Sequence, residues 1–234
     1  MVKKILVGAL TILFALCMVG CGGGDDKAAA PEKKADTAKV EGSADKAVMA
    51  YAQLYAFGVV EDEYMAAAGM AEKDIEAVQE QVLAPIVQAF QGYPLSDENI
   101  AEITGQYISK LSAGMDMKAT IKKDDPANPV VELTATTINQ EAATKVAENN
   151  ENLLALGAEY GKLQAQGLTE EQIKSNPEFQ KMAMEAINKF IDEFPLNEEK
   201  SVEITCEAVK GSDGKMYWAP KNPEDVAKFV TGQK

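Results

Sequence analysis

The chain has 234 residues, and its 37 acidic side chains outnumber 23 basic ones, which gives a formal net charge of −14. All of the basic residues are Lys, because the sequence contains neither Arg nor His. The absence of His excludes Ser-His-Asp catalysis and the usual nitrogen-ligand zinc site, and the absence of Arg removes bidentate guanidinium recognition. An isoelectric point near 4.5 argues against nucleic acid as a partner, because phosphate binding needs a basic surface.

The first twenty residues have the pattern of an export signal. Lys3 and Lys4 form a positive start, and 5–19 is an apolar run of about fifteen residues. This run is shorter than the roughly twenty residues that a membrane-spanning helix needs. A charged start, a short apolar stretch and a small residue at the end define a secretory signal, so we expect 1–20 to be removed.

The end of this segment resembles the lipobox of bacterial lipoproteins, in which a small residue precedes the Cys that is lipidated. Gly20 and Cys21 match that pattern, whereas Met18 and Val19 differ from the commoner Leu followed by Ala or Ser. The resemblance implies cleavage before Cys21 and fatty acyl chains attached to its sulfur. It also implies a bacterial cell membrane or outer membrane as the partner, with the protein facing away from the cytoplasm. The alternative is an ordinary secretory peptide with an incidental Cys.

The remaining chain divides into a tether and a domain. Residues 21–42 begin with glycines and continue with small and charged residues, so they cannot bury enough apolar surface to offset their ordering entropy. Residues 43–234 are long enough for a single domain with a core of its own. If Cys17 leaves with the signal and Cys21 carries lipid, Cys206 is the remaining thiol and no internal disulfide can form. The mature chain then has a net charge of −16.

Apolar periodicity predicts the elements of the domain. Helical spacing is found, in chain order, at 43–57, 61–68, 75–90 with a kink or break at Pro85, 96–114, 141–167, 176–195 and 222–230. A capping-box pattern lies at 169–172. Alternating apolar residues predict one hairpin from 115–121 and 131–137, and a second from 202–208 and 216–219. The expected fold class is α+β, with amphipathic helices packed on a small, mostly antiparallel sheet made of two hairpins.

The domain resembles lipoproteins with a cystatin-like or nuclear-transport-factor-like α+β fold. The resemblance rests on the opening helix 44–57, on 133–138 at the end of the first hairpin and on 213–218 in the second, and it covers 43–220. It implies a curved sheet packed on helices, sometimes around a pocket, and it implies no activity. The helices at 141–193 depart from the simplest form of that fold.

The candidate ligand-binding residues are aromatic. Tyr51, Tyr55, Tyr217 and Trp218 are expected to line an apolar pocket, although aromatic residues at this spacing are more often part of a core. Cys206 lies on the apolar side of its strand and reads as an inert core residue. Acidic clusters occur at 61–63, 97–98 and 124–125, but none has the spacing of a calcium loop. We therefore assign no metal site, no cofactor and no catalytic residue.

Residues 93–104 recur in similar form at 194–205, which fits either an old duplication or chance. For function, we expect a lipid-anchored, non-catalytic module outside the cytoplasm that binds an unknown envelope protein or small ligand. A solute-binding lipoprotein of an importer is the alternative, and a carboxylate-based hydrolase is a further one.

Overall fold

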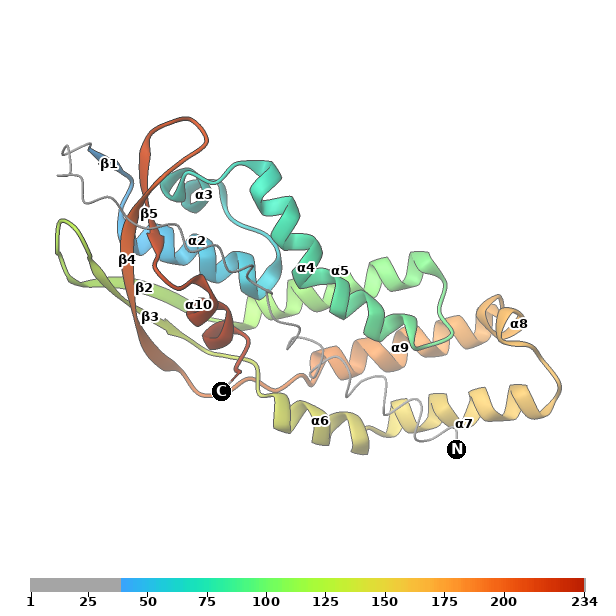
Figure 1. Cartoon of the computed structure of the whole chain (residues 1–234). Helices are drawn as coiled ribbons and strands as arrows, with labels where there is room; N and C mark the ends of the chain where they lie inside the picture. Colours follow the sequence, from blue (N-terminus) through green and yellow to red (C-terminus); the bar gives the residue numbers. More distant parts are fainter. Residues whose placement is uncertain (1–38, 234) are drawn as a thin grey trace, which may run out of the picture.

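The computed structural model describes residues 39–233, which fold around one curled five-stranded sheet (Figure 1). The strands, in spatial order, are β1 (Val40–Glu41), β5 (Met216–Pro220), β4 (Lys200–Lys210), β3 (Val130–Ala135) and β2 (Met117–Lys123). The α+β class predicted from the sequence is thereby confirmed. The predicted signal peptide, its cleavage site at Gly20 and Cys21, and most of the tether lie outside the described residues.

Both predicted hairpins are present, and antiparallel pairing of β3 with β4 joins them into one sheet. The alternation of side chains is that of a sheet with one buried face, because Val131 and Leu133 of β3 and Cys206 of β4 are fully buried. The sheet differs from the prediction in having a fifth strand. Val40 and Glu41, which the sequence pattern assigns to the tether, pair in parallel with Met216 and Tyr217.

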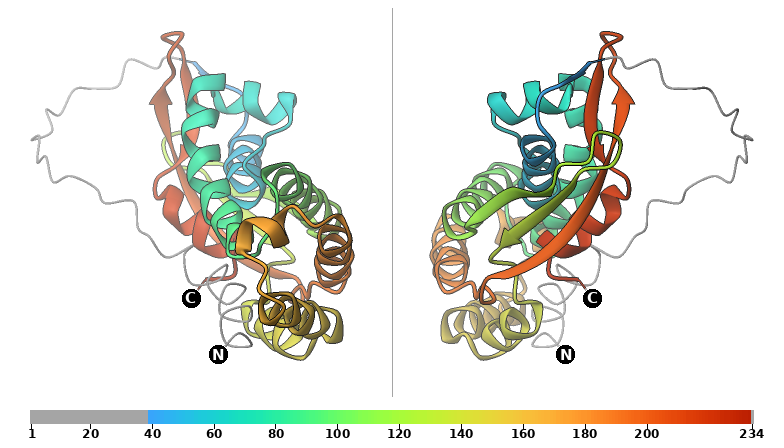
Figure 2. Two further views of the ribbon diagram at one scale, coloured as in Figure 1. Left: turned by 90° about the vertical axis from the view of Figure 1, so that its right-hand side faces the viewer. Right: turned by 90° about the vertical axis from the view of Figure 1, so that its left-hand side faces the viewer.

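The helices cover one face of the sheet and extend beyond it, as the two views of Figure 2 show. They are α2 (Ala44–Phe57), α3 (Asp62–Ala68), α4 (Glu72–Gln91), α5 (Asp97–Gly114), α6 (Gln140–Asn149), α7 (Glu151–Ala165), α8 (Glu170–Lys174), α9 (Pro177–Asp192) and α10 (Pro223–Val230). Helix α2 packs directly on the sheet, while α7, α8 and α9 project away from it (Figure 1). Among residues 39–233 we find no helix with the length and apolar character that crossing a membrane requires.

The helix boundaries follow local capping chemistry. The predicted capping box forms at α8, where Thr169 and Gln172 bond to each other's backbone N–H groups. Pro85 does not split its helix, since α4 continues from Glu72 to Gln91 around it. The single helix predicted over 141–167 is wrong, because the chain forms two helices with Asn150 between them.

Asn150 causes this break. Its side-chain oxygen accepts hydrogen bonds from the N–H groups of Asn152 and Leu153, both at 3.1 Å, and so caps α7. Its amide nitrogen donates to the Glu193 carboxylate at 3.0 Å, just after α9. An Asn side chain that bonds to nearby N–H groups competes with a continuous helix, and here it also ties α7 to α9.

The two similar segments of the sequence fold differently. Residues 101–104 lie inside α5, whereas the corresponding 202–205 lie inside β4. The resemblance of the two segments therefore does not extend to secondary structure.

We expect Asn150→Ala to destabilise the protein by about 2 kcal/mol, because a helix cap is lost and two backbone N–H groups at a buried position are left without it. Urea unfolding measures the difference. The matched control is Asn149→Ala, since Asn149 is exposed and should change stability by less than about 0.5 kcal/mol. Equal effects of the two substitutions would contradict the capping role.

Candidate functional site

The structure forms a surface groove of about 440 Å³ between α5 and α9. Four of its lining residues recur at helical spacing on α5 and three do so on α9, so each helix contributes one face. The α5 residues are Gln106, Ser109, Lys110 and Ala113, and the α9 residues are Asn188, Ile191 and Asp192. The groove is open to solvent, and its lining combines polar side chains with the apolar Ala113 and Ile191.

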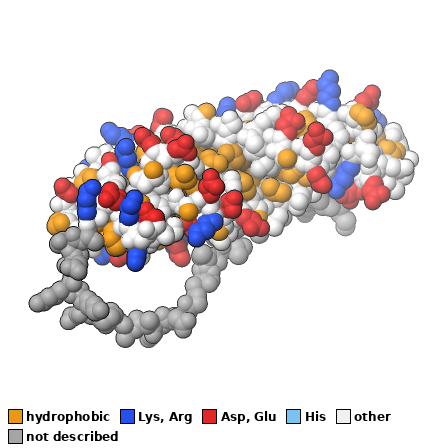
Figure 3. Space-filling view, turned by 90° about the horizontal axis from the view of Figure 1, so that it is seen from above, with side chains coloured by type: hydrophobic (Ala, Val, Ile, Leu, Met, Phe, Trp, Pro, Cys, Tyr) orange, Lys and Arg blue, Asp and Glu red, His pale blue; other side chains and the backbone are white. Residues whose placement is uncertain are grey.

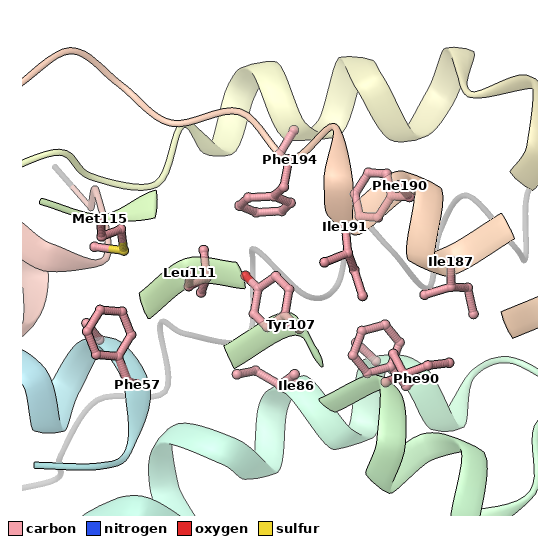
Figure 4. Packing of buried hydrophobic residues seen from close by; sticks show 14 of the residues in the cluster. Phe57, Ile86, Phe90, Tyr107, Leu111, Met115, Ile187, Phe190, Ile191 and Phe194 are labelled. Atoms are coloured by element: carbon pink, nitrogen blue, oxygen red, sulfur yellow. The ribbon is translucent and has the colours of Figure 1, made fainter. Parts of the chain in front are cut away.

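An aromatic cluster beside the groove holds the two helices in place. Tyr107 of α5 meets Phe194 edge to face, with ring centroids 5.3 Å apart, and Phe194 meets Phe190 of α9 in the same way at 5.9 Å. Figure 4 shows Tyr107, Phe194 and Ile191 gathered between these helices. Edge-to-face pairs add about 0.5–1.5 kcal/mol each beyond their burial. The buried side of the groove is therefore closely packed.

Gln180 of α9 fixes the other end of α5. Its amide nitrogen donates to the Pro94 carbonyl at 2.7 Å, and its oxygen accepts from the Asn99 amide at 2.8 Å and from the Ser96 N–H at 3.1 Å. Ser96 is the N-cap of α5 and accepts from the Asn99 N–H. A single side chain thus joins the start of α5 to α9.

The polar groups of the groove can form hydrogen bonds with a ligand, but few of them could act as an acid or a base. Lys110 and Asp192 form an ion pair of 3.2 Å across the two helices, but their side chains are 45% and 73% exposed. Such exposed pairs contribute at most about 1 kcal/mol. The Asn188 side-chain oxygen is buried with no hydrogen-bond partner among the described residues. A buried acceptor of this kind favours a ligand or water that donates a hydrogen bond.

The four predicted aromatic residues lie elsewhere and do not line this groove. Tyr51 and Tyr55 are one turn apart on α2, with ring centroids 6.3 Å apart, and both pack against the main core. Burial is the main reason that the pKa of Tyr51 is raised above its usual value. Trp218 packs on the small cluster of Ala47, Ala50 and Ala68.

Tyr217 is buried at the turn between β4 and β5. Its hydroxyl donates to the Asp213 carboxylate at 2.9 Å, and Asp213 also accepts from the Lys215 N–H at 3.0 Å. The backbone bond from Lys215, followed by the bond from Tyr217, lowers the pKa of Asp213. The ring packs closely on Gly69 and Gly211. These contacts make Tyr217 part of the turn's structure.

Cys206 is fully buried on the inner face of β4, and burial raises the pKa of its thiol to about 12. It is therefore a neutral thiol at physiological pH. Asp125 of the 124–125 cluster accepts from the N–H groups of Ala127 and Asn128, which lowers its pKa to about 2. This carboxylate shapes the β2–β3 turn. In the described part of the chain, no three acidic or Cys side chains gather as metal ligands would.

Helix α4 buries only the second half of the apolar stripe that its spacing predicts. Only Ile86, Ala89 and Phe90 of this helix are buried, so apolar residues such as Ile75 and Val78 in its first half stay partly exposed. Figure 3 shows hydrophobic side chains gathered over the middle of the molecule, where α4 lies in Figure 1. Apolar surface of this kind is typical of a protein contact.

Comparisons with known proteins add no relative. No family model matches the chain, and neither a curated protein nor a solved structure is significantly similar to it.

We expect Gly69→Ala to destabilise the protein by about 2–4 kcal/mol. Gly69 has a φ of +62°, and a Cβ there would overlap the Tyr217 ring, so backbone strain adds to overpacking. Gly161→Ala in α7 is the control, because a Cβ there meets nothing within 4 Å and should stabilise the helix by about 0.5–1 kcal/mol. Chemical unfolding of both variants measures the difference. An unchanged free energy of unfolding in Gly69→Ala would contradict the close packing of Tyr217 on Gly69.

We also expect Cys206 to be unreactive in the folded protein. A raised pKa means that very little thiolate exists at pH 8, and thiolate is the reacting form. In a variant with Cys17→Ala and Cys21→Ala, a thiol reagent at pH 8 should modify Cys206 at least about a hundredfold more slowly in buffer than in denaturant. Equal rates would mean that the thiol is accessible.

Proposed function

We propose that the protein is a lipid-anchored module outside the cytoplasm, which binds an envelope protein or small ligand without catalysing a reaction. The observation that carries the proposal is the N-terminal pattern, in which a charged start and an apolar run lead to Gly20 and Cys21. A polar segment then separates Cys21 from the folded residues. Two or three acyl chains on Cys21 would supply the anchor, since one chain alone binds membranes only marginally.

The place where the tether joins the fold supports this arrangement. Strand β1 runs parallel to β5 and begins beside Met216, next to the β4–β5 turn. The β2–β3 turn lies beside the middle of β4, where the Cys206 N–H bonds to the Pro129 carbonyl, and like the β4–β5 turn it lies on the side of the molecule away from α7 and α8 (Figure 1). The described chain thus begins on the side of the molecule that carries both hairpin turns, and α7 and α8 project away from that side (Figure 1).

The charge of the chain also differs between the hairpins and the helical part. The two hairpins, 117–135 and 200–221, contain seven Lys against six acidic residues, whereas 138–199 contains five Lys against twelve. Anionic lipid headgroups repel the acidic helical part more strongly than the nearly neutral hairpins. The hairpin end is therefore the end that we place toward the membrane, which leaves the helical part accessible to a partner.

The alternatives have less support. Importer receptors are usually built from two α/β lobes, but the described residues form one sheet in which only the short β1–β5 pair is parallel. A carboxylate hydrolase needs two carboxyl groups that face each other, and Asp192 is the single carboxylate lining the groove. The groove, with the unpaired Asn188 oxygen, favours ligand binding over hydrolysis.

Acylation is tested by expressing the full chain in a bacterium fed with a clickable palmitate analogue. The wild type should incorporate the label and remain in the membrane fraction. Cys21→Ala should abolish labelling, because the acylated sulfur is gone. Cys17→Ala is the matched control and should keep the label, since Cys17 belongs to the signal. Labelling that persists in Cys21→Ala, or is absent from the wild type, would refute the anchor.

A further inference from the structure

Strand β2 is the last strand of the sheet, and its outer edge pairs with none of the described residues (Figure 2, right). The Thr136 N–H bonds to the Asp116 carbonyl, so Asp116 faces β3. Because N–H and C=O groups alternate in direction along an antiparallel strand, Met117, Ala119 and Ile121 point theirs away from β3. Three residues thus present donors and acceptors at this edge.

The side chains of the same edge are apolar on one face and charged on the other. Met117 and Ala119 pack partly against the core, and Ile121 is 38% exposed, which is unusual for a large apolar residue here. Lys118 and Lys122 lie on the opposite, solvent face. A bulge after Ile121 ends the regular pairing. Edge strands without a partner are normally short, charged or covered, and β2 is only partly protected by its lysines.

We propose that the β2 edge pairs with the β2 edge of a second copy of this chain, antiparallel, with Ala119 at the two-fold axis. The two sheets then become one continuous sheet. Three residue pairs then form between the copies: Ala119 faces Ala119, Met117 faces Ile121, and Ile121 faces Met117. Each pair exchanges two backbone hydrogen bonds, which gives about six. A two-fold interface is the commonest form of self-association.

This register is selected by the side chains. Asp116 of each copy lies opposite Lys122 of the other, and Met117 of each copy lies opposite Ile121 of the other. Opposite charges therefore face each other, as do apolar side chains. Lys122 already contacts Glu132 at 2.9 Å, and its ammonium has further donors to offer.

Moving the axis by one residue loses these pairs. With Thr120 at the axis, Lys118 faces Lys122 of the second copy, and with Lys118 at the axis, Lys118 faces itself. Like charges directly opposite each other are destabilising. Among these three adjacent positions of the axis, Ala119 is therefore the one that we expect.

The test is disulfide cross-linking of the full chain in whole expressing cells, before any fractionation. Ala119→Cys places two thiols opposite each other at a hydrogen-bonded pair, about 5.5 Å between Cα atoms, which a disulfide can span. Mild oxidation should give a covalent dimer on a non-reducing gel. Thr120→Cys is the matched control, because two copies of residue 120 are diagonal and too far apart. The wild type reports any background from its own Cys residues.

Charge exchange provides a second measurement. Lys122→Glu in the Ala119→Cys chain should reduce cross-linking a few-fold, because two opposite-charge pairs become like-charge pairs. Adding Asp116→Lys should restore it. Absence of an Ala119→Cys dimer, or cross-linking as strong in Thr120→Cys, would overturn the proposal. Since these measurements do not depend on acylation, a failure here is distinguishable from a failure of the anchor.

Discussion

The burial of α2 is the constraint on which the fold depends. Ten of the fourteen residues of this helix are buried, and it contacts the sheet, α3, α4 and α10. A helix that is buried on nearly all sides must carry small or apolar residues all round, and its alanines, such as Ala47, Ala50 and Ala52, let neighbouring backbones approach closely. The curl of the sheet follows, because its inner face wraps around this one helix (Figure 2).

The regular elements could be predicted from the sequence because their side chains repeat with a clear period. Alternation over 131–137 and 202–208 marks strands with one buried face, and Asn176 before Pro177 marks the start of α9. Two features could not be predicted. Strand β1 has only two residues and therefore no period. The break at Asn150 combines a local cap with a contact to Glu193, which is distant in sequence.

The groove and the exposed sheet edge were harder to predict from the sequence than the helices and strands. The groove requires α5 and α9 to meet, and its ion pair joins residues 82 positions apart, so each helix alone shows only an ordinary polar face. The aromatic residues were easier to find than to interpret. Tyr51 and Tyr55 do lie together, as their spacing indicates, but Tyr217 supports a turn through Asp213. Which strand lies at an edge also depends on non-local pairing, because β3 pairs with β4 across a gap filled by four helices.

The manner in which β1 is attached has a mechanical consequence. Only Val40 and Glu41 pair with β5, and they do so in parallel, so tension arriving from residues before Lys39 acts along the strand and shears very few hydrogen bonds. Gly42, with a φ of +72°, then turns the chain into α2. If the chain is pulled from its N-terminal side, β1 is the strand expected to separate first, which lengthens the extended segment by about 3.3 Å for each residue released. The remaining strands and the core stay unstretched until the force reaches α2.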